Sequence, residues 1–462
     1  MAEIKATDLR QLIRNFNPQT ELAPGSSFYV EVDDARNSKG EASVRRKIEV
    51  RYKDMAEDIR TGQELAFCRA LFCGHRASGK TTELRILQDV LKDDYMVVFL
   101  DKVDRQQDRF SDEVSFLYFV ISEIVSAVSE NEKLADADEL GIRDLCDYLA
   151  HTIFTEEKDV EEELLKDSTS YSAGAEAGGG PSLFGLVARF FAKVSTETAF
   201  DTQTKRVRET AMQRNFMAFV EIANNILLAI NRKLMEEGRT LLIMIDGLDK
   251  VSDEIADRIF LNQQSSLTLL KCSMIVTFPV SLKYSPRAKM GVDKYDGTYM
   301  LSMIKVHERD GSPCREGVLA MRKIVECRMD TKLLLENPVK NLDRAIQMSG
   351  GNVRDLFGFF TYAATNARTC GREKIKTQDL ELAFDNLRSD LRRSFTKEYL
   401  PVLKEVYEDT TKESVIMQGP EDDILKKLFG ADLLIEYNGK RWCDLHPLVR
   451  EIVEKMISEG KL

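Results

Sequence analysis

The chain has 462 residues, of which 43% are hydrophobic and 31% charged, and its formal net charge is −11. This composition is typical of a soluble globular protein with two to four domains. No segment reaches the roughly 18 uninterrupted apolar residues that a membrane helix needs, and the charged N-terminal stretch lacks an apolar signal core, so we expect a cytoplasmic protein without a transmembrane segment. Eight cysteines without a CxxC pair and four histidines without HExxH argue against a disulfide framework and structural zinc.

Residues 1–60 precede the first predicted strand and form a leader. The stretch "PGSSFYVEVDDAR" (24–36) predicts an extended segment, and residues 41–60 predict a helix. An arm that links domains is the simplest interpretation of this leader.

A phosphate-binding loop follows at residues 74–81. "GHRASGKT" fits G-x4-G-K-[ST] without a mismatch, between an apolar strand at 70–73 and a predicted helix. Glycines let successive N–H groups point at phosphate oxygens, and the helix N-terminus adds its positive dipole end. The alternative is an ordinary glycine turn. The motif predicts that ATP is bound by Gly74, His75, Arg76, Ala77, Ser78, Gly79, Lys80, Thr81 and Thr82.

Within this loop, Lys80 should reach the β- and γ-phosphates, and the Thr81 hydroxyl should ligate Mg²⁺. A second acidic strand completes such a site. "TLLIMIDGLDK" predicts a buried strand at 240–245 that delivers Asp246 to the carboxyl edge of a sheet, where Asp246 would hold Mg²⁺ through water. Many ATP-hydrolysing enzymes carry glutamate directly after this aspartate, whereas Gly247 stands here.

Further apolar strands are predicted at 95–101, 272–279 and 298–306. Five such strands separated by helical stretches predict a parallel sheet with helices on both faces. The interval before Asp246 is longer than one crossover helix needs. It contains a helix at 112–130, a flexible linker by composition at 168–182, and an amphipathic segment at 183–194. We favour an ordinary packed helix for the last segment; a docking helix for a partner or membrane surface is the alternative.

Residues 311–395 predict a helical lid with helices at 315–329, 353–367 and 377–395, the last capped by Thr377. Residues 396–462 predict a helix, a hairpin turning at Asn438-Gly439, and a second helix. This order is that of a winged helix. The segment holds 10 Lys/Arg and 14 Asp/Glu, a net charge of −4, whereas a DNA reader needs a basic face. We therefore favour packing on the core or on a partner over duplex binding.

The phosphate loop, "LLIMIDGLDK" and "SGGNVRDLF" resemble the AAA+/STAND P-loop ATPases. "IDGLD" is similar to the acidic motif of NACHT-type STAND proteins, and "SGGNVRDL" resembles the lid helix of Orc1/Cdc6-like and archaeal ATPases. The leader and loop also resemble bacterial ATPases with a "GHRGSGKSTEL"-like loop. The resemblance implies an α/β fold of ASCE/AAA+ type: a P-loop NTPase core (61–310) with a helical insertion at about 105–238, a helical lid (311–395) and a winged-helix-like domain (396–462).

The resemblance also implies roles for individual residues. Asp249 would polarise the attacking water, and Thr277, which ends the fourth strand, would sense the γ-phosphate. Arg354, at the start of a lid helix, would be the second sensor. Arg287 lies where AAA+ rings place a trans-acting arginine, although a surface arginine without this role is the favoured alternative. Because Asp249 is shorter than glutamate and three positions past Asp246, hydrolysis is expected to be slow or to need assembly.

The sequence thus predicts an ATP- and Mg²⁺-dependent switch that hydrolyses ATP slowly and controls self-assembly, as a homo-oligomer, or an effector protein. The resemblance to these ATPases implies a role in bacterial antiphage defence. Two alternatives stay open. One is an Orc1/Cdc6-like initiator or loader that binds DNA, which the acidic C-terminal segment disfavours. The other is a binding module in which ATP is structural.

Overall fold

The computed structural model describes residues 3–37, 40–62, 65–110, 113–129, 216–261, 266–283, 292–409, 423–438 and 442–462. Four features singled out in the sequence lie outside these residues: the linker at 168–182, the amphipathic segment at 183–194, Arg287, and Gly439 of the predicted hairpin turn.

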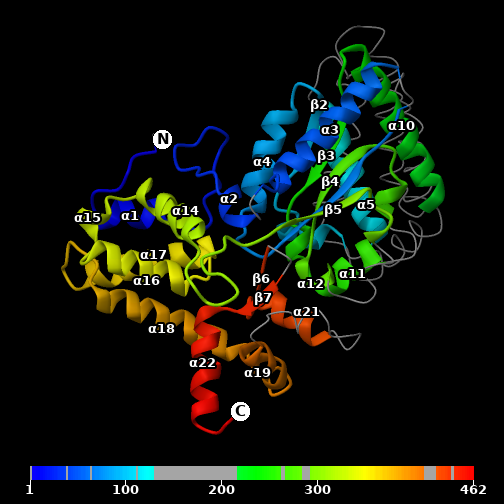
Figure 1. The fold of residues 1–462 in the computed structure, drawn as a ribbon. Helices are drawn as coiled ribbons and strands as arrows, with labels where there is room; N and C mark the ends of the chain where they lie inside the picture. Colours follow the sequence, from blue (N-terminus) through cyan, green and yellow to red (C-terminus); the bar gives the residue numbers. More distant parts are fainter. Residues whose placement is uncertain are drawn as a thin grey trace, which may run out of the picture.

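The core is a five-stranded parallel sheet in the order β2-β3-β4-β1-β5, which confirms the predicted α/β fold (Figure 1). The strands are β1 (Arg69–Gly74), β2 (Tyr95–Leu100), β3 (Thr240–Ile245), β4 (Ser273–Phe278) and β5 (Gly297–Leu301). The edge strand β5 ends earlier than predicted. Beyond it the chain bonds to the leader instead, since Lys305 N donates to Ala35 O at 3.0 Å.

Helices cover both faces of the sheet because strand side chains alternate. On one face Ala70 and Phe72 pack with α3 (Val44–Arg60) and α4 (Lys80–Leu91). On the other face Leu71 and Cys73 belong to the main core, with α5 (Glu113–Ser129), α10 (Phe216–Glu236) and α11 (Asp253–Leu261). Short helices join these elements: η1 (Val103–Arg109), η3 (Leu248–Lys250), η4 (Ser266–Leu269) and α12 (Val280–Lys283). Among the described residues, no helix combines the length and apolar composition of a bilayer crossing.

The predicted lid is helical and holds α14 (Arg315–Glu326), α15 (Thr331–Leu334), α16 (Pro338–Met348), α17 (Val353–Thr369) and α18 (Thr377–Arg393). α15 and α16 are additional to the three predicted helices. The prediction that Thr377 caps α18 was wrong, because Thr377 is the first helical residue. The cap position belongs to Lys376, whose N–H donates to the Asp379 carboxylate at 2.9 Å.

The leader crosses from the lid to the core. Its helix α1 (Leu9–Asn15) packs on α17, and the Phe16 ring lies 5.1 Å from that of Phe357. The segment predicted as extended contains a short helix, α2 (Asp33–Arg36), which lies beside the phosphate loop (Figure 1). Helix α3 then begins at Val44, and the hydroxyl of Ser43 before it accepts a hydrogen bond from Arg46 N and caps the helix. The leader is therefore built into both parts.

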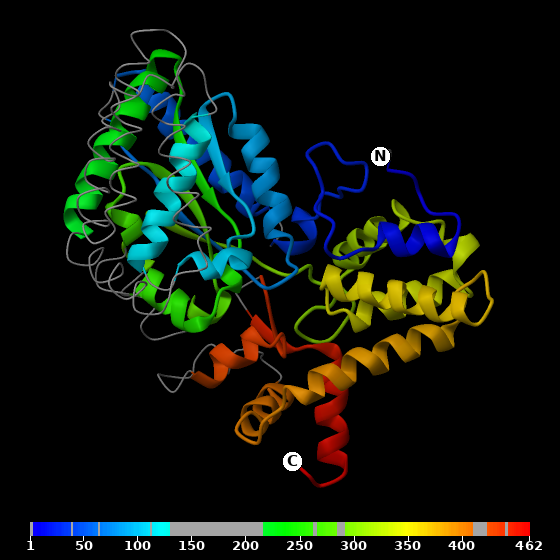
Figure 2. The same ribbon diagram turned by 180° about the vertical axis from the view of Figure 1, so that it is seen from behind.

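The C-terminal segment contains α19 (Leu400–Glu408), α21 (Asp423–Gly430), the antiparallel pair β6 (Leu434–Tyr437) and β7 (Trp442–Leu445), and α22 (Pro447–Ser458). Figure 2 shows the hairpin where core and lid meet. Tyr437 donates its hydroxyl to Gly350 O in the lid at 2.6 Å, and Lys283 of the core lies 3.5 Å from Glu436.

The leader helix α3 can be tested as a part of the core. The buried Tyr52 hydroxyl lies 2.7 Å from Met274 O and 3.2 Å from Cys68 O. Tyr52→Phe should lower the free energy of unfolding by about 1–3 kcal/mol, because a buried hydrogen bond is lost. Chemical denaturation measures this, with exposed Val50→Ala on the same helix as the control. Equal midpoints for Tyr52→Phe and wild type would contradict the assignment.

Candidate functional site

The phosphate loop lies at the carboxyl edge of the sheet, between β1 and α4. Its backbone takes left-handed conformations at Ala77 (φ 61°) and Gly79 (φ 93°). Alternating conformations of this kind turn successive N–H groups toward one point and form an anion-binding nest. The N-terminus of α4 at Lys80 faces the same point and adds its dipole. The loop therefore has the geometry that the motif predicts.

Lys80 is buried, and its ammonium group is held by the protein itself. Its Nζ donates to Gly74 O and His75 O, each at 2.7 Å, and lies 2.9 Å from Asp249 Oδ2. The ammonium therefore has a carboxylate partner before any phosphate arrives. A nucleotide phosphate would have to compete with Asp249 for it.

Asp246 and Thr81 meet as the motif requires. The Thr81 hydroxyl donates to Asp246 Oδ2 at 2.6 Å, and Asp246 is 2% exposed. Its second oxygen, Oδ1, is buried without a hydrogen-bond partner among the described residues. Burial, followed by the charge of Asp249, raises the pKa of Asp246. A hard cation bound by oxygen would satisfy the orphaned atom and offset both effects, so the pair fits Mg²⁺.

Asp249 is buried beside Lys80 and does not face the open cavity. Its side chain is 2% exposed, and it is not among the residues that line the cavity described below. Burial alone would raise its pKa, but the Lys80 and Lys250 ammonium groups outweigh burial and hold the pKa of Asp249 below its usual range. Asp249 is therefore a carboxylate that serves as the counter-ion of Lys80. Its predicted role toward water stays a prediction.

Thr277 lies between the two motifs. It is the last residue but one of β4, which runs between β1 and β3, and it is fully buried with its Oγ1 unpartnered in the described part of the chain. Arg354 is the second residue of α17, after the N-cap Asn352, and it faces the cavity from the lid. The two residues expected to sense the γ-phosphate thus lie in different parts of the structure, Thr277 within the sheet and Arg354 in the lid.

A cavity of about 490 Å³ lies between the loop, the lid and the leader. At one end it is lined by residues that suit phosphate and magnesium: Ser78, Gly79, Lys80, Thr81, Asp104, Asp246 and Lys250. Toward the leader and the lid the lining holds Arg328 and Arg354 together with a group of apolar residues: Phe28, Val32, Ile304, Ile324, Val353 and Phe357. A polar end and a group of apolar residues in one cavity fit a nucleotide with its phosphates on the loop.

Two buried arginines in this cavity were not predicted from the sequence. Arg36 of α2 donates to Ser78 O of the loop at 2.6 Å and to Ser302 O. Arg328, 4% exposed, lies between the Phe28 and Phe357 rings, 5.0 and 4.9 Å from their centroids. Burial lowers the pKa of both guanidinium groups. The acceptors of Arg36 and the aromatic neighbours of Arg328 come from distant parts of the chain, so no local pattern marks either residue as part of the cavity.

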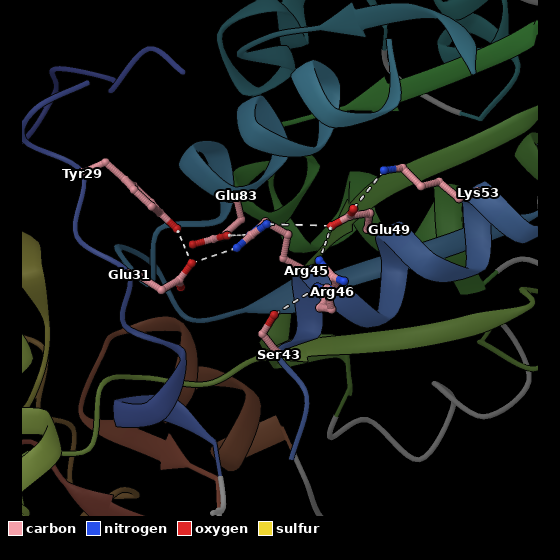
Figure 3. Close-up of polar contacts among 8 residues, drawn as sticks. All are labelled: Tyr29, Glu31, Ser43, Arg45, Arg46, Glu49, Lys53 and Glu83. Atoms are coloured by element: carbon pink, nitrogen blue, oxygen red, sulfur yellow. Dashed lines mark hydrogen bonds and ion pairs between the residues drawn. The ribbon is translucent and has the colours of Figure 1, made fainter. Parts of the chain in front are cut away.

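A network of charged side chains ties the leader to the helix of the phosphate loop (Figure 3). Arg45 of α3 lies 2.8 Å from Glu31 and 3.0 Å from Glu83 of α4. The Tyr29 hydroxyl reaches Glu31 at 3.4 Å. Because Tyr29 and Glu83 both line the cavity, this network forms its wall on the leader side.

His75 connects the phosphate loop to the C-terminal hairpin. Its Nε2 accepts a hydrogen bond from Glu436 N at 2.9 Å, and its ring lies 5.6 Å from that of Phe429. Burial, with the nearby Lys80 and Lys283 charges, lowers the pKa of His75 to about 3. The imidazole is thus neutral and acts as an acceptor. The sequence motif indicated a loop position here and gave no sign of this partner.

A parallel sheet with a phosphate loop after its first strand defines the chain as an α/β P-loop NTPase by fold. No family model matches its sequence, and no curated protein matches it either.

Three solved structures illustrate what this chain is similar to in the course of its backbone. The Walker-type ATPase of Pyrococcus abyssi is 10% identical with a TM-score of 0.40, and 93% of this chain and 99% of that one are covered. The ORC2 protein of Aeropyrum pernix in its ADP form is 12% identical, with a TM-score of 0.41 and 97% and 98% covered. The RuvB branch migration motor of Thermotoga maritima is 9% identical, with a TM-score of 0.34 and 93% and 98% covered. Likeness at this level identifies no activity.

The contact between loop and hairpin predicts a pH dependence. The folded pKa of His75, about 3, lies below its ordinary value of 6.5. Its contribution to stability is therefore complete above pH 6.5 and is lost as pH falls from 6.5 toward 3. His75→Gln keeps an acceptor that does not titrate. Over this pH range we expect the free energy of unfolding of wild type to fall by about 1 kcal/mol per pH unit more than that of the variant. Chemical denaturation at several pH values measures this, and equal pH dependence of the two free energies would contradict it.

Proposed function

We propose that the chain is an ATP- and Mg²⁺-binding switch that hydrolyses ATP slowly. The observation that carries this proposal is the meeting of Lys80, Thr81 and Asp246 at the polar end of the 490 Å³ cavity. Lys80 and the loop N–H groups would bind the phosphates, and Thr81 and Asp246 would hold Mg²⁺, which neutralises charge on the phosphate oxygens. The adenine base of ATP would lie among the apolar residues of the leader and the lid.

The contacts around the cavity suggest how nucleotide would change the protein. Phosphate would draw the Lys80 ammonium from Asp249, and Lys80 also holds His75 O. His75 in turn accepts from the hairpin at Glu436 N. Arg354 would close the lid on the γ-phosphate, and hydrolysis would reset the site. The loop, lid and hairpin would then move as one unit.

The outcome of this switch would be a surface for self-assembly or for an effector protein in the cytoplasm, with bacterial antiphage defence as the setting. Arg287 would act in trans if the chain assembles into a ring. These assignments rest on the resemblance of the motifs to STAND and AAA+ ATPases.

A DNA-binding initiator or loader is the second candidate, favoured by the helix–hairpin–helix order after the lid. Two observations weigh against it. The C-terminal segment is acidic, and its hairpin is occupied in packing against His75 and Gly350. The winged-helix-like domain is therefore proposed to couple core and lid.

The assembly proposal can be tested by native mass measurement of the full chain with ATP, with ADP and without nucleotide. We expect a larger species with Mg²⁺·ATP, and its absence in Asp246→Asn, because that variant lacks the carboxylate proposed to hold the metal. Unchanged mass in all three conditions would contradict assembly. Steep salt-dependent binding of duplex DNA would favour the loader instead.

Arg328 tests where the base lies. In the described part of the chain the hydrogen bonds of its guanidinium group come from Nη1, which leaves Nε and Nη2 for an acceptor on the nucleotide base. Arg328→Met should weaken ATP binding about tenfold or more and leave binding of base-free tripolyphosphate unchanged. The matched control is Arg322→Met, which removes a lid arginine paired with Asp343. Equal losses for both ligands in titration calorimetry would assign Arg328 a structural role.

A further inference from the structure

One carboxylate occupies the space that a side chain at position 247 would take. Gly247 has φ +102°, and a Cβ built there would lie 2.6 Å from Asp104 Oδ1 and 2.9 Å from Val103 N. A glutamate after Asp246 is therefore excluded by both backbone strain and space. The carboxylate found next to this position belongs to Asp104.

The backbone holds Asp104 at the phosphate end of the cavity. Val103 N donates to Asp246 O at 3.0 Å, and Asp246 N donates to Leu100 O at 2.9 Å. The start of η1 is thereby fixed beside the end of β3. Asp104 lines the cavity together with Thr81 and Asp246.

Asp249 is a weaker candidate for activating water. It is buried, is not among the residues that line the cavity, and is paired with the Lys80 ammonium at 2.9 Å. A carboxylate that a lysine stabilises in its charged form is a poor proton acceptor, and a general base must reach the water it activates. Its position suits a counter-ion that releases Lys80 to phosphate.

We propose that Asp104 is the carboxylate that activates the attacking water, an inference that rests on the ATP hydrolysis proposed above. A water in the cavity gives a proton to the Asp104 carboxylate as its oxygen bonds to the γ-phosphorus. The bond from that phosphorus to the bridging oxygen of ADP breaks, and the bond's electron pair stays with ADP. The proton then leaves Asp104 for solvent, so the products are ADP and inorganic phosphate.

The test compares Asp104→Asn with Asp249→Asn in the full chain, with turnover measured by phosphate release and ATP affinity by calorimetry. We expect Asp104→Asn to lower kcat about 100-fold or more, the usual share of a general base, with affinity within about threefold. Asp104→Glu should restore part of the rate. Asp249→Asn should change ATP affinity and lower the unfolding midpoint, because Lys80 loses its counter-ion, but its kcat at saturating ATP should stay within about tenfold of wild type, because Asp104 stays in place.

Asp101→Asn is the matched control. Asp101 comes shortly before η1, pairs with Arg85 at 2.9 Å and with Lys102 at 3.5 Å, and is not itself among the residues that line the cavity, so its loss should leave kcat and affinity unchanged. Wild-type turnover in Asp104→Asn overturns the proposal, and so does lost turnover with retained affinity in Asp249→Asn. A parallel fall of affinity and unfolding midpoint in Asp104→Asn assigns it a structural role. A wild type that neither binds nor hydrolyses ATP contradicts the proposed function itself.

Discussion

The geometry of the site depends on one buried ion pair, between the Lys80 ammonium and the Asp249 carboxylate. Lys80 begins the helix after β1, and Asp249 follows β3, so the pair spans the end of the intervening strand β4. Neither charge tolerates burial alone, since an unpaired buried ion costs several kcal/mol. Any phosphate that takes Lys80 must therefore be accompanied by a rearrangement around Asp249. Because of this constraint, binding of a phosphate in the cavity requires a change in the structure around Asp249.

The parts around the cavity contact one another, so a rearrangement at Lys80 and Asp249 would change the contacts of each of them. The leader lies on the lid through α1, reaches the phosphate loop through Arg36, and packs on the sheet through α3. The C-terminal hairpin bonds to the loop at His75 and to the lid at Gly350. Core, lid and leader thus line one cavity, and the C-terminal hairpin touches the core and the lid next to it through His75 and Gly350.

Much of the fold could be predicted from the sequence because its signals are local. Short apolar runs mark the strands, and "GHRASGKT" places the turn, the helix start and the lysine together. The structure brings Thr81 and Asp246 into contact as predicted. Arg36 and Arg328 could not be predicted, because their partners are defined by the folded chain. Arg36 bonds to Ser302 and Ser78, far along the sequence.

Gly247 shows the same limit most clearly. In the sequence it was a departure from a familiar acidic pattern, and its cause was invisible. The structure gives the cause: at the start of η1, the backbone of Val103 and the side chain of Asp104 occupy the space that a side chain at position 247 would need. Asp249 was expected to polarise the attacking water, and the structure pairs it with Lys80 instead; this pairing depends on the order and register of β3, β4 and β1. Pairing registers of this kind are not encoded within either strand alone.

The central claim, that the cavity binds a nucleoside triphosphate through Lys80, is tested most directly by titrating the full chain with ATP and Mg²⁺ in a calorimeter. The account predicts one site per chain. Binding should be lost in Lys80→Ala and kept in Lys92→Ala, which removes an exposed lysine at the far end of the same helix. No binding by wild type, or equal binding by Lys80→Ala, would contradict it.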